Sequence, residues 1–250
     1  MVNPIKAAIG DFVLTFTWMF ISSTLGLVTT EIMKAFDLQF VTYNGVNYPF
    51  IIITTLLIFI IIFTFTAIGN ALGGASFNPT GNASFYAAGL GSDTLISMAI
   101  RFPAQALGAV AGAKAIKEVI PPKYSHMIGG PALKVDLHTG AIAEGVLTFS
   151  ITFAVLFILL RGPRSEFMKT LLMSMSTVAV ILIGSAYTGP SMNPILAYGW
   201  AYLDDWHHTW DQLYVYWICP FIGAILAAWI FRAVFPPPQV VKKQKKRKEA

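Results

Sequence analysis

The sequence predicts an all-α membrane protein with six transmembrane helices and two re-entrant half-helices arranged as an inverted repeat. The first observation is composition, because 56% of the 250 residues are hydrophobic and only 12% are charged, about half the charged share of an ordinary soluble domain. The second is a set of long stretches without any charged residue, at 12–30, 38–92, 170–203 and 212–231. The third is an Asn-Pro dipeptide that occurs twice in similar surroundings, at Asn78 and at Asn193.

The predicted spans follow one another along the chain, and each needs about 20 residues. The first begins near Ala7 and carries Asp11, and its apolar run is too long for the h-region of a cleavable signal. The stretch 38–92 is too long for one span and too short for two spans and a loop, so part of it is predicted to be re-entrant. The remaining spans are the third at about 94–113, containing Arg101, the fourth at about 141–160, containing Glu144, and two more within 170–203 and 212–231.

Basic residues set the expected orientation. If Lys6 faces the cytosol and the spans alternate, most of the 17 Lys and Arg residues lie on the cytosolic side, which places both termini there. Many of these residues belong to the lysine-rich end, so the formal net charge of +5 reflects a tail and predicts no nucleic-acid partner. Residues 234–250 are expected to form a disordered basic cytosolic tail against anionic lipid headgroups.

An internal repeat divides the chain into two halves, at about 7–118 and 140–233. Asp11 and Glu144 each precede, after one variable residue, the same Val-Leu-Thr-Phe run. The two Asn-Pro motifs lie 115 positions apart, and Gly108-Ala109 matches Gly223-Ala224 at the same offset. Since each half holds three spans, the second half begins on the opposite side of the membrane, which makes the repeat inverted.

Each Asn-Pro motif is predicted to start a short helix, because Asn is favoured at the N-cap and Pro at the first helical position. The helices would cover about 79–90 and 194–202, and each would reach about half the bilayer core. They enter from opposite faces, so their N-termini are expected to meet near the midplane.

Two helix N-termini at one place favour a pore that excludes ions. Each contributes about half a positive charge, which repels cations and protons. The Asn amides donate to the oxygen of a passing water, and its hydrogens are then poorly placed to continue a proton wire. Non-helical backbone at this depth is tolerated where it is buried in protein or lines a water-filled cavity. The two motifs therefore predict a pore.

With these motifs the sequence resembles the aquaporins, also called major intrinsic proteins, over about residues 8–233. Selectivity in that family is explained by the same helix-dipole argument. The resemblance rests on Asp11 and Glu144, both Asn-Pro motifs, Gln105-x-x-Gly108 and Pro220-x-x-Gly223. The motifs Asn78-Pro79-Thr80, Tyr187-Thr-Gly-Pro190 and Gly199-Trp-Ala-Tyr202, with the lysine-rich end, resemble the plant small basic intrinsic proteins of type 1.

The resemblance implies what the protein does. It implies a single aquaporin-like channel domain over 1–233, passive passage of water and of other small neutral solutes, and a homotetramer in the lipid bilayer. It implies neither an enzyme activity nor a cofactor nor a metal. The family usually has Asn-Pro-Ala twice, with an arginine directly after the second. Here the motifs are Asn78-Pro79-Thr80 and Asn193-Pro194-Ile195, and Leu196 follows the second.

The family pattern places the outer selectivity filter at Ile58, Ile181, Pro190 and Leu196, with Phe59 as the alternative to Ile58. These side chains would form an entirely apolar ring that has no fixed positive charge and offers no donor to replace the hydration of a permeant. A narrow apolar ring resists wetting.

The family also implies roles for residues outside the pore. Asp11 and Glu144 are expected to be buried acids that accept hydrogen bonds from the re-entrant loops, and the alternative is proton coupling. Lys246 and Lys248 resemble a dilysine retrieval signal, which predicts the endoplasmic reticulum membrane.

A group of histidines and acids precedes the last span. His207 and His208, with Asp204, Asp205 and Asp211, resemble a metal cluster only loosely and are interpreted as residues that cap and solvate the loop before the last span.

Two other classes of function remain open at this point. A secondary transporter of a small solute also uses inverted repeats and broken helices, but it is expected to place a charged coupling residue near the midplane. A largely closed structural membrane protein is the second alternative. The sequence contains no Ser/His/Asp order, nucleotide loop or metal-ligand spacing that indicates an enzyme.

Overall fold

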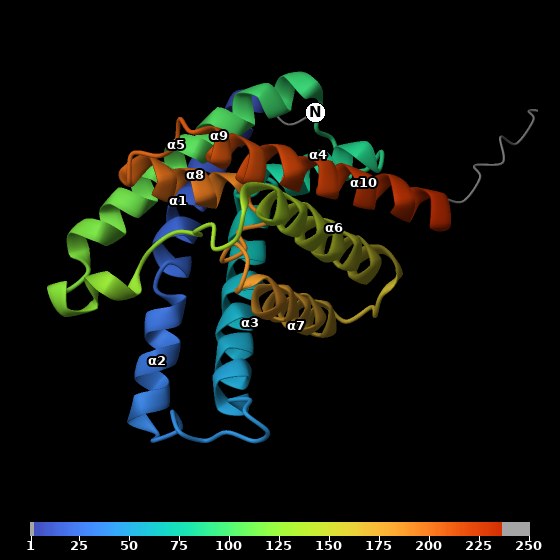
Figure 1. The fold of residues 1–250 in the computed structure, drawn as a ribbon. Helices are drawn as coiled ribbons and strands as arrows, with labels where there is room; N and C mark the ends of the chain where they lie inside the picture. Colours follow the sequence, from blue (N-terminus) through green and yellow to red (C-terminus); the bar gives the residue numbers. More distant parts are fainter. Residues whose placement is uncertain (1–2, 237–250) are drawn as a thin grey trace, which may run out of the picture.

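A computed structural model describes residues 3–236, and within that range the chain is all-α apart from one isolated bridge between Tyr43 and Val46 (Figure 1). Among the described residues, six helical segments are long and apolar enough to cross a membrane, which confirms the predicted fold class. The elements are α1 (Pro4–Ser22), α2 (Leu25–Ala35), α3 (Tyr48–Ala71), α4 (Pro79–Ala87), α5 (Leu95–Val119), η1 (Pro122–Met127), α6 (Leu137–Arg161), α7 (Glu166–Gly184), α8 (Pro194–Leu203), α9 (Trp210–Leu213), the π segment η2 (Tyr214–Ile218) and α10 (Cys219–Val234).

The first span is longer than its uncharged stretch and consists of two helices, α1 and α2. Two hydroxyls mark the break, because Ser23 Oγ donates to the carbonyl of Met19 at 2.6 Å and Thr24 Oγ1 donates to that of Ile21 at 2.8 Å. Such local side-chain bonds offer the backbone carbonyls an alternative to the helical ladder, and here they coincide with the end of α1. Charge-free length therefore underestimated this span, which covers Pro4–Ala35.

The last span contains a wider π turn. Pro220 has no N–H, so the carbonyl four residues before it loses its usual helical donor. The chain responds at Tyr214–Ile218, where the N–H of Cys219 donates to the carbonyl of Tyr214, five residues back.

The half-helix α4 ends at Ala87, earlier than the predicted limit at residue 90. Gly89 adopts φ +69°, the left-handed conformation that glycine tolerates best. The N–H of Leu90 donates to the carbonyl of Phe85 at 2.8 Å, and that of Gly89 donates to Tyr86 at 2.9 Å. This is a Schellman ending, and it stops α4 well short of a full span.

The two halves of the chain repeat one packing arrangement. α1 packs against α5, and α6 packs against α10, the pair visible side by side in Figure 1. A Cβ added at Gly108 would lie 2.5 Å from the carbonyl oxygen of Phe12, and one at Gly223 would overlap the carbonyl oxygen of Gly145. Glycine at both positions lets each pair of helices approach closely.

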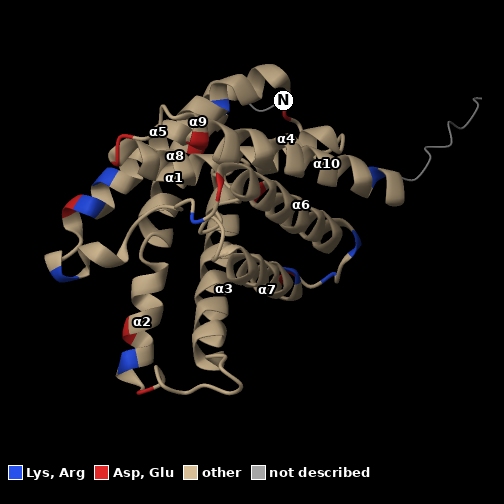
Figure 2. Cartoon of the chain, in the orientation of Figure 1, with Lys and Arg blue, Asp and Glu red and all other residues tan. Residues whose placement is uncertain are grey.

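The outer surface is apolar along most of each long helix. In Figure 2 the charged residues, in blue and red, lie mainly at helix ends and in loops, and the middle parts of the helices are largely tan. Large apolar side chains point outward, among them Ile60 (58% exposed) and Trp229 (57%). A surface of this kind is stable against lipid rather than water. The expected tail beyond residue 236, with Lys246 and Lys248, lies outside the described residues.

Candidate functional site

The two Asn-Pro motifs meet in the interior of the molecule. Asn78 and Asn193 are the N-caps of α4 and α8, and each Oδ1 accepts from the backbone N–H two residues later, at 3.0 and 3.1 Å. Pro79 and Pro194 occupy the first helical positions. Both helices therefore start as the residue types predict.

The motifs also bind to each other. Asn78 Nδ2 donates to the carbonyl of Met192 at 3.2 Å, and Asn193 Nδ2 donates to that of Phe77 at 2.9 Å. Each amide thus uses one of its two N–H groups to hold the opposite loop. The sequence analysis did not predict that the amides bind the opposite loop, since it assigned both of them to the permeant alone.

Thr80, one departure from the family pattern, adds a hydroxyl to this junction. Its Oγ1 lies 2.7 Å from Asn78 Oδ1 and 3.3 Å from the carbonyl oxygen of Met192. Ile195, the other departure, is fully buried. Asn193 still forms its N-cap hydrogen bond beside that bulkier side chain.

Two buried acids hold the loops that precede the motifs. Asp11 accepts from the N–H of Ser76 at 2.8 Å. Glu144 accepts from the N–H groups of Ser191 and Met192, at 2.9 and 3.0 Å, and from Thr188 Oγ1 at 2.8 Å. Both acids have no solvent exposure, and each accepts at least one hydrogen bond from the backbone of a re-entrant loop.

Arg101 distinguishes the anchor of the first repeat half, at Asp11, from that of the second, at Glu144. The sequence analysis treated Arg101 only as an interruption of an apolar span. It is 6% exposed, and its guanidinium donates to both Asp11 oxygens, at 2.7 and 2.8 Å. It also donates to Asp93 at 2.7 Å and to the carbonyl of Gly74 at 3.0 Å. A lone arginine in an apolar span was the signal, since such residues pair with a buried acid.

Gln105 completes this network by donating to Asp11 at 2.8 Å and to Asn82 Oδ1 at 3.2 Å. Asp93 lies in the loop between α4 and α5. Burial raises the pKa of Asp93, but hydrogen bonds from Asn82, Arg101 and Ser97, with the Arg101 charge, hold that pKa below its ordinary value. The loop carboxylate therefore stays ionised and keeps Arg101 fixed.

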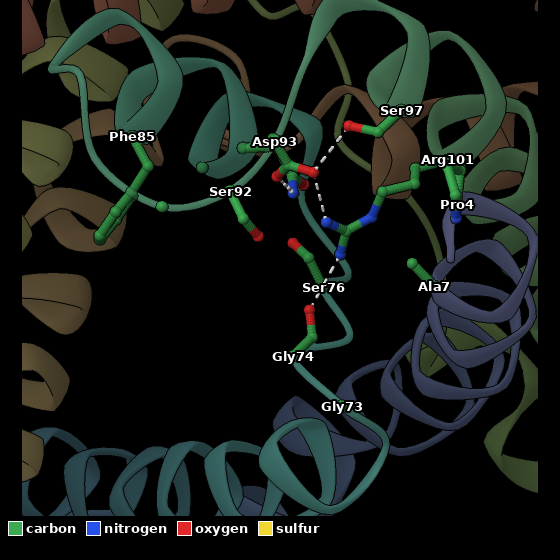
Figure 3. A pocket seen from close by; sticks show the side chains of 13 residues that line it. Pro4, Ala7, Gly73, Gly74, Ser76, Phe85, Ser92, Asp93, Ser97 and Arg101 are labelled. Atoms are coloured by element: carbon green, nitrogen blue, oxygen red, sulfur yellow. Dashed lines mark hydrogen bonds and ion pairs between the residues drawn. The ribbon is translucent and has the colours of Figure 1, made fainter. Parts of the chain in front are cut away.

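A cavity of about 320 Å³ opens beside this network, between the start of α1, the loops flanking α4 and the start of α5. Figure 3 shows Arg101 at its edge, directed toward Asp93 and the Gly74 backbone. Its lining residues are Pro4, Ala7, Gly73, Gly74, Ser76, Gly81, Asn82, Phe85, Gly91, Ser92, Asp93, Ser97 and Arg101.

The residues predicted for the outer filter come from four places in the chain. Ile58 is buried on α3, at 5% exposure, and the alternative Phe59 instead contacts the ring of Phe167 at 5.1 Å between centroids. Ile181 on α7 packs against the cluster that contains Met192.

The other two filter residues lie on either side of the second motif. Pro190 lies against α7 at Gly184, where an added Cβ would be 2.7 Å from the Pro190 ring. Leu196 on α8 packs against the cluster that contains Met19 and Trp200.

Other side chains support the re-entrant loops without having been predicted. Trp18 and Phe77 stack with centroids 3.8 Å apart, and Phe65 meets Trp18 edge-on at 5.1 Å. Tyr216, which lies in the π turn, donates its hydroxyl hydrogen to the carbonyl of Thr188 at 3.1 Å. Aromatic residues are common in any apolar span, so the sequence carried no signal for these contacts.

A model of the family described as Major intrinsic protein matches residues 1–231. The chain belongs to the major intrinsic protein family. Within it, this aquaporin-family chain is 55% identical to "Aquaporin SIP1-1" of Zea mays, over 97% of each protein, and 54% identical to "Aquaporin SIP1-1" of Arabidopsis thaliana, over 99% of this chain and 100% of the relative. "Probable aquaporin SIP2-1" of Arabidopsis thaliana is 32% identical over 93% of each.

The fold is that of a solved family structure. The X-ray structure of the aquaglyceroporin from Plasmodium falciparum superimposes with a TM-score of 0.68, over 94% of this chain and 98% of that one, at 17% identity. The comparisons confirm the family and subgroup resemblance predicted from the motifs. This aquaporin-family chain is a multi-pass membrane channel protein of the SIP1 group, and its family comprises channels rather than enzymes.

Proposed function

We propose that this chain conducts water and other small neutral solutes passively, through a pore that passes between the N-termini of α4 and α8. The observation that carries the proposal is the reciprocal bonding of the two motifs, from Asn78 to the Met192 carbonyl and from Asn193 to the Phe77 carbonyl. This bonding holds both helix N-termini at one point. It leaves the second N–H of each amide free to meet a permeant oxygen.

Cations and protons are excluded at this point for electrostatic reasons. Each helix N-terminus contributes about half a positive charge. The two nearby acids are engaged elsewhere, since Asp11 forms an ion pair with Arg101 and Glu144 accepts from the N–H groups of Ser191 and Met192. Their engagement also argues against a proton-coupled transporter, which needs a carboxyl group that is free to change its proton occupancy during transport. Passive flow is the simpler function for this site.

The outer constriction is proposed to consist of Ile58, Ile181, Pro190 and Leu196. Such a ring has no cationic group, so it discriminates by size and by the difficulty of wetting an apolar passage. We propose that a single channel domain, 1–233, forms a homotetramer in the endoplasmic reticulum membrane, with both termini cytosolic and Lys246 and Lys248 as the retrieval signal.

Flux measurements on reconstituted protein test the pore. Liposomes containing the purified chain are followed by stopped-flow light scattering, first under an impermeant osmolyte and then with glycerol and urea, with a proton-flux assay in parallel. Water flux well above that of empty vesicles, without proton leak, is expected. Asn193→Asp places a negative charge at the midplane, and we expect it to alter water flux and admit protons.

Matched controls separate the pore from the bilayer and the fold. Asn44→Asp makes the same chemical change at an exposed loop position, and it should behave as the original chain. Flux that matches empty vesicles for all three permeants would contradict the proposal and favour a closed structural protein. Flux that saturates or follows the proton gradient would instead favour a transporter.

The filter has its own test. Leu196→Arg puts a fixed positive charge and five donors into the proposed ring, and the ratio of glycerol to water flux is expected to fall because the passage becomes narrower and better hydrated. Leu213→Arg, at a leucine that is 47% exposed on α9, is the control. An unchanged ratio in Leu196→Arg would remove this residue from the filter.

A further inference from the structure

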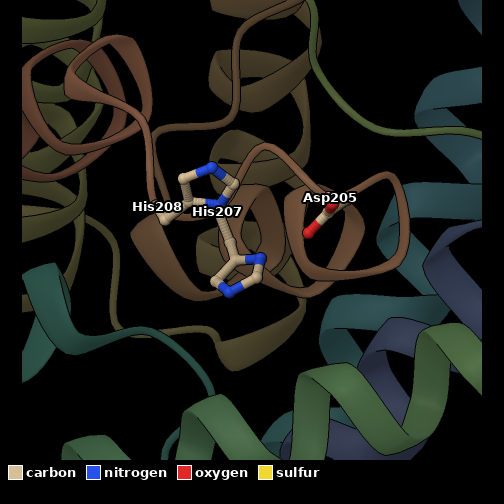
Figure 4. Close-up of side chains that lie close together, drawn as sticks. All are labelled: Asp205, His207 and His208. Carbon is tan, nitrogen blue, oxygen red and sulfur yellow. The ribbon is translucent and has the colours of Figure 1, made fainter.

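The loop after α8 brings three metal-ligating side chains to one place. Asp205, His207 and His208 each offer one ligand atom, and these atoms all lie within 4.8 Å of one another. Figure 4 shows the two imidazoles and the carboxylate on one turn of the loop. The sequence interpretation assigned these residues to capping and solvation and did not separate the three from their acidic neighbours.

The structure makes that separation. Asp204 lies 3.3 Å from Lys117 and forms an ion pair with it. Asp205 has φ +58°, a left-handed backbone conformation, so the chain turns away from the direction of α8 at this residue. The N–H groups of Trp206 and His207 both donate to the carbonyl of Ala201, at 3.0 and 3.1 Å, which fixes the turn.

The ring of His207 is held in place by α8. Its centroid lies 4.7 Å from that of Tyr202 and 5.9 Å from that of Tyr198. Its Nδ1 atom is buried and has no hydrogen-bond partner within residues 3–236. A buried polar atom without a partner is costly, and an ion bound to this nitrogen would satisfy it.

Two imidazole nitrogens and one carboxylate oxygen suit a first-row divalent ion better than Ca²⁺ or Mg²⁺, which prefer oxygen ligands. Zinc binds nitrogen at about 2.0–2.1 Å in tetrahedral sites, so neighbouring ligand atoms lie about 3.4 Å apart. Binding therefore requires side-chain rotations within this four-residue segment that bring the ligand atoms, now within 4.8 Å of one another, to that spacing.

We propose that Asp205, His207 and His208 bind one Zn²⁺ or chemically similar first-row ion, with water completing its coordination. The site links the loop to the end of α8, whose opposite end carries Asn193. It is independent of the permeant and of the filter assigned above.

Zinc titration of the full-length chain in lipid nanodiscs, after removal of any histidine tag, tests the proposal. Isothermal titration calorimetry with ZnCl₂ is expected to show one saturable site per chain. The His207→Ala/His208→Ala variant should bind at least about tenfold more weakly, since even loss of an outer-shell partner weakens metal sites by about that factor. The His126→Ala/His138→Ala variant removes the same number of histidines elsewhere and should bind as the original chain does.

A spectroscopic measurement keeps the test decisive if the first variant fails to fold. Cu²⁺ added to the unmodified chain at one equivalent is expected to give an electron paramagnetic resonance spectrum with coupling to two imidazole nitrogens. No zinc binding, equal binding by the His207→Ala/His208→Ala variant, equal competition by Ca²⁺, or a copper spectrum without nitrogen coupling would each overturn the proposal.

Discussion

Replacing Arg101 with methionine is the most direct test of how the first re-entrant loop is held. Met fills a similar volume but removes every donor. Asp11, which has no solvent exposure, would then keep, among the residues that the structure describes, the Ser76 N–H and Gln105 Nε2 as its hydrogen-bond partners. Its charge would stay buried without a compensating cation.

The expected magnitude follows from that unpaired charge. Removing one partner of a buried ion pair destabilises a protein by about 3–5 kcal/mol. For a chain of this length, each kcal/mol lowers Tm by about 2–4 °C, so a fall of about 6–20 °C is expected. Arg101→Lys keeps the charge but cannot contact Asp11, Asp93 and the Gly74 carbonyl together. Its Tm should therefore lie between that of Arg101→Met and that of the original chain.

Thermal unfolding in detergent, followed by tryptophan fluorescence, measures these shifts. Arg232→Met is the matched control, because within residues 3–236 Arg232 makes one hydrogen bond, to the carbonyl of Ala88 at 3.2 Å. Its loss should cost no more than about 1.5–3 kcal/mol, because the donor is charged but the bond is single. Asp11→Asn provides a double-mutant cycle, and its effect should be smaller in the Arg101→Met background than in the original chain.

A result that would refute this reasoning is an Arg101→Met variant whose Tm falls no further than that of Arg232→Met. Additive effects of Arg101→Met and Asp11→Asn would refute it as well. Either outcome would mean that the Ser76 N–H and Gln105 are enough to hold Asp11, and that the arginine is not part of the anchor.

Three further predictions concern the junction and the helix packing. Thr80→Ala removes the hydroxyl 2.7 Å from Asn78 Oδ1, and a loss of about 1 kcal/mol in stability with lower water flux per channel is expected from melting and liposome shrinkage; unchanged flux would show that Thr80 does not orient the amide. Tyr216→Phe deletes the bond to a loop carbonyl at 3.1 Å, and a Tm decrease equivalent to about 0.5–1.5 kcal/mol should be seen by fluorescence. Gly223→Val forces a side chain onto the backbone of α6 and should lower the free energy of unfolding by about 1–3 kcal/mol or more. Gly26→Ala, whose added Cβ has no described atom within 4 Å, should be neutral or slightly stabilising, and equal Tm values for the two variants would contradict close packing at Gly223.

The sequence by itself determined the features that depend on local chemistry. Apolar length sets the number of spans, because a bilayer accepts only segments that satisfy their own backbone hydrogen bonds. The preference of Asn and Pro for the first positions of a helix determines where α4 and α8 begin. The family resemblance followed from the order and spacing of such motifs, and the family comparison bears it out. The filter assignment remains a proposal.

Only the tertiary structure decided which distant groups meet. Asn193 donates to a carbonyl 116 positions away, and Arg101 reaches an acid 90 positions away. These contacts depend on how the helices pack and on which side-chain rotamers can reach a partner. Neither property leaves a periodic pattern of residue types in the sequence. The break after α1, the end of α4 and the turn at Asp205 also depend on individual hydrogen bonds and dihedral angles. A lone charge in an apolar span signals that a partner exists, but only the folded chain identifies it.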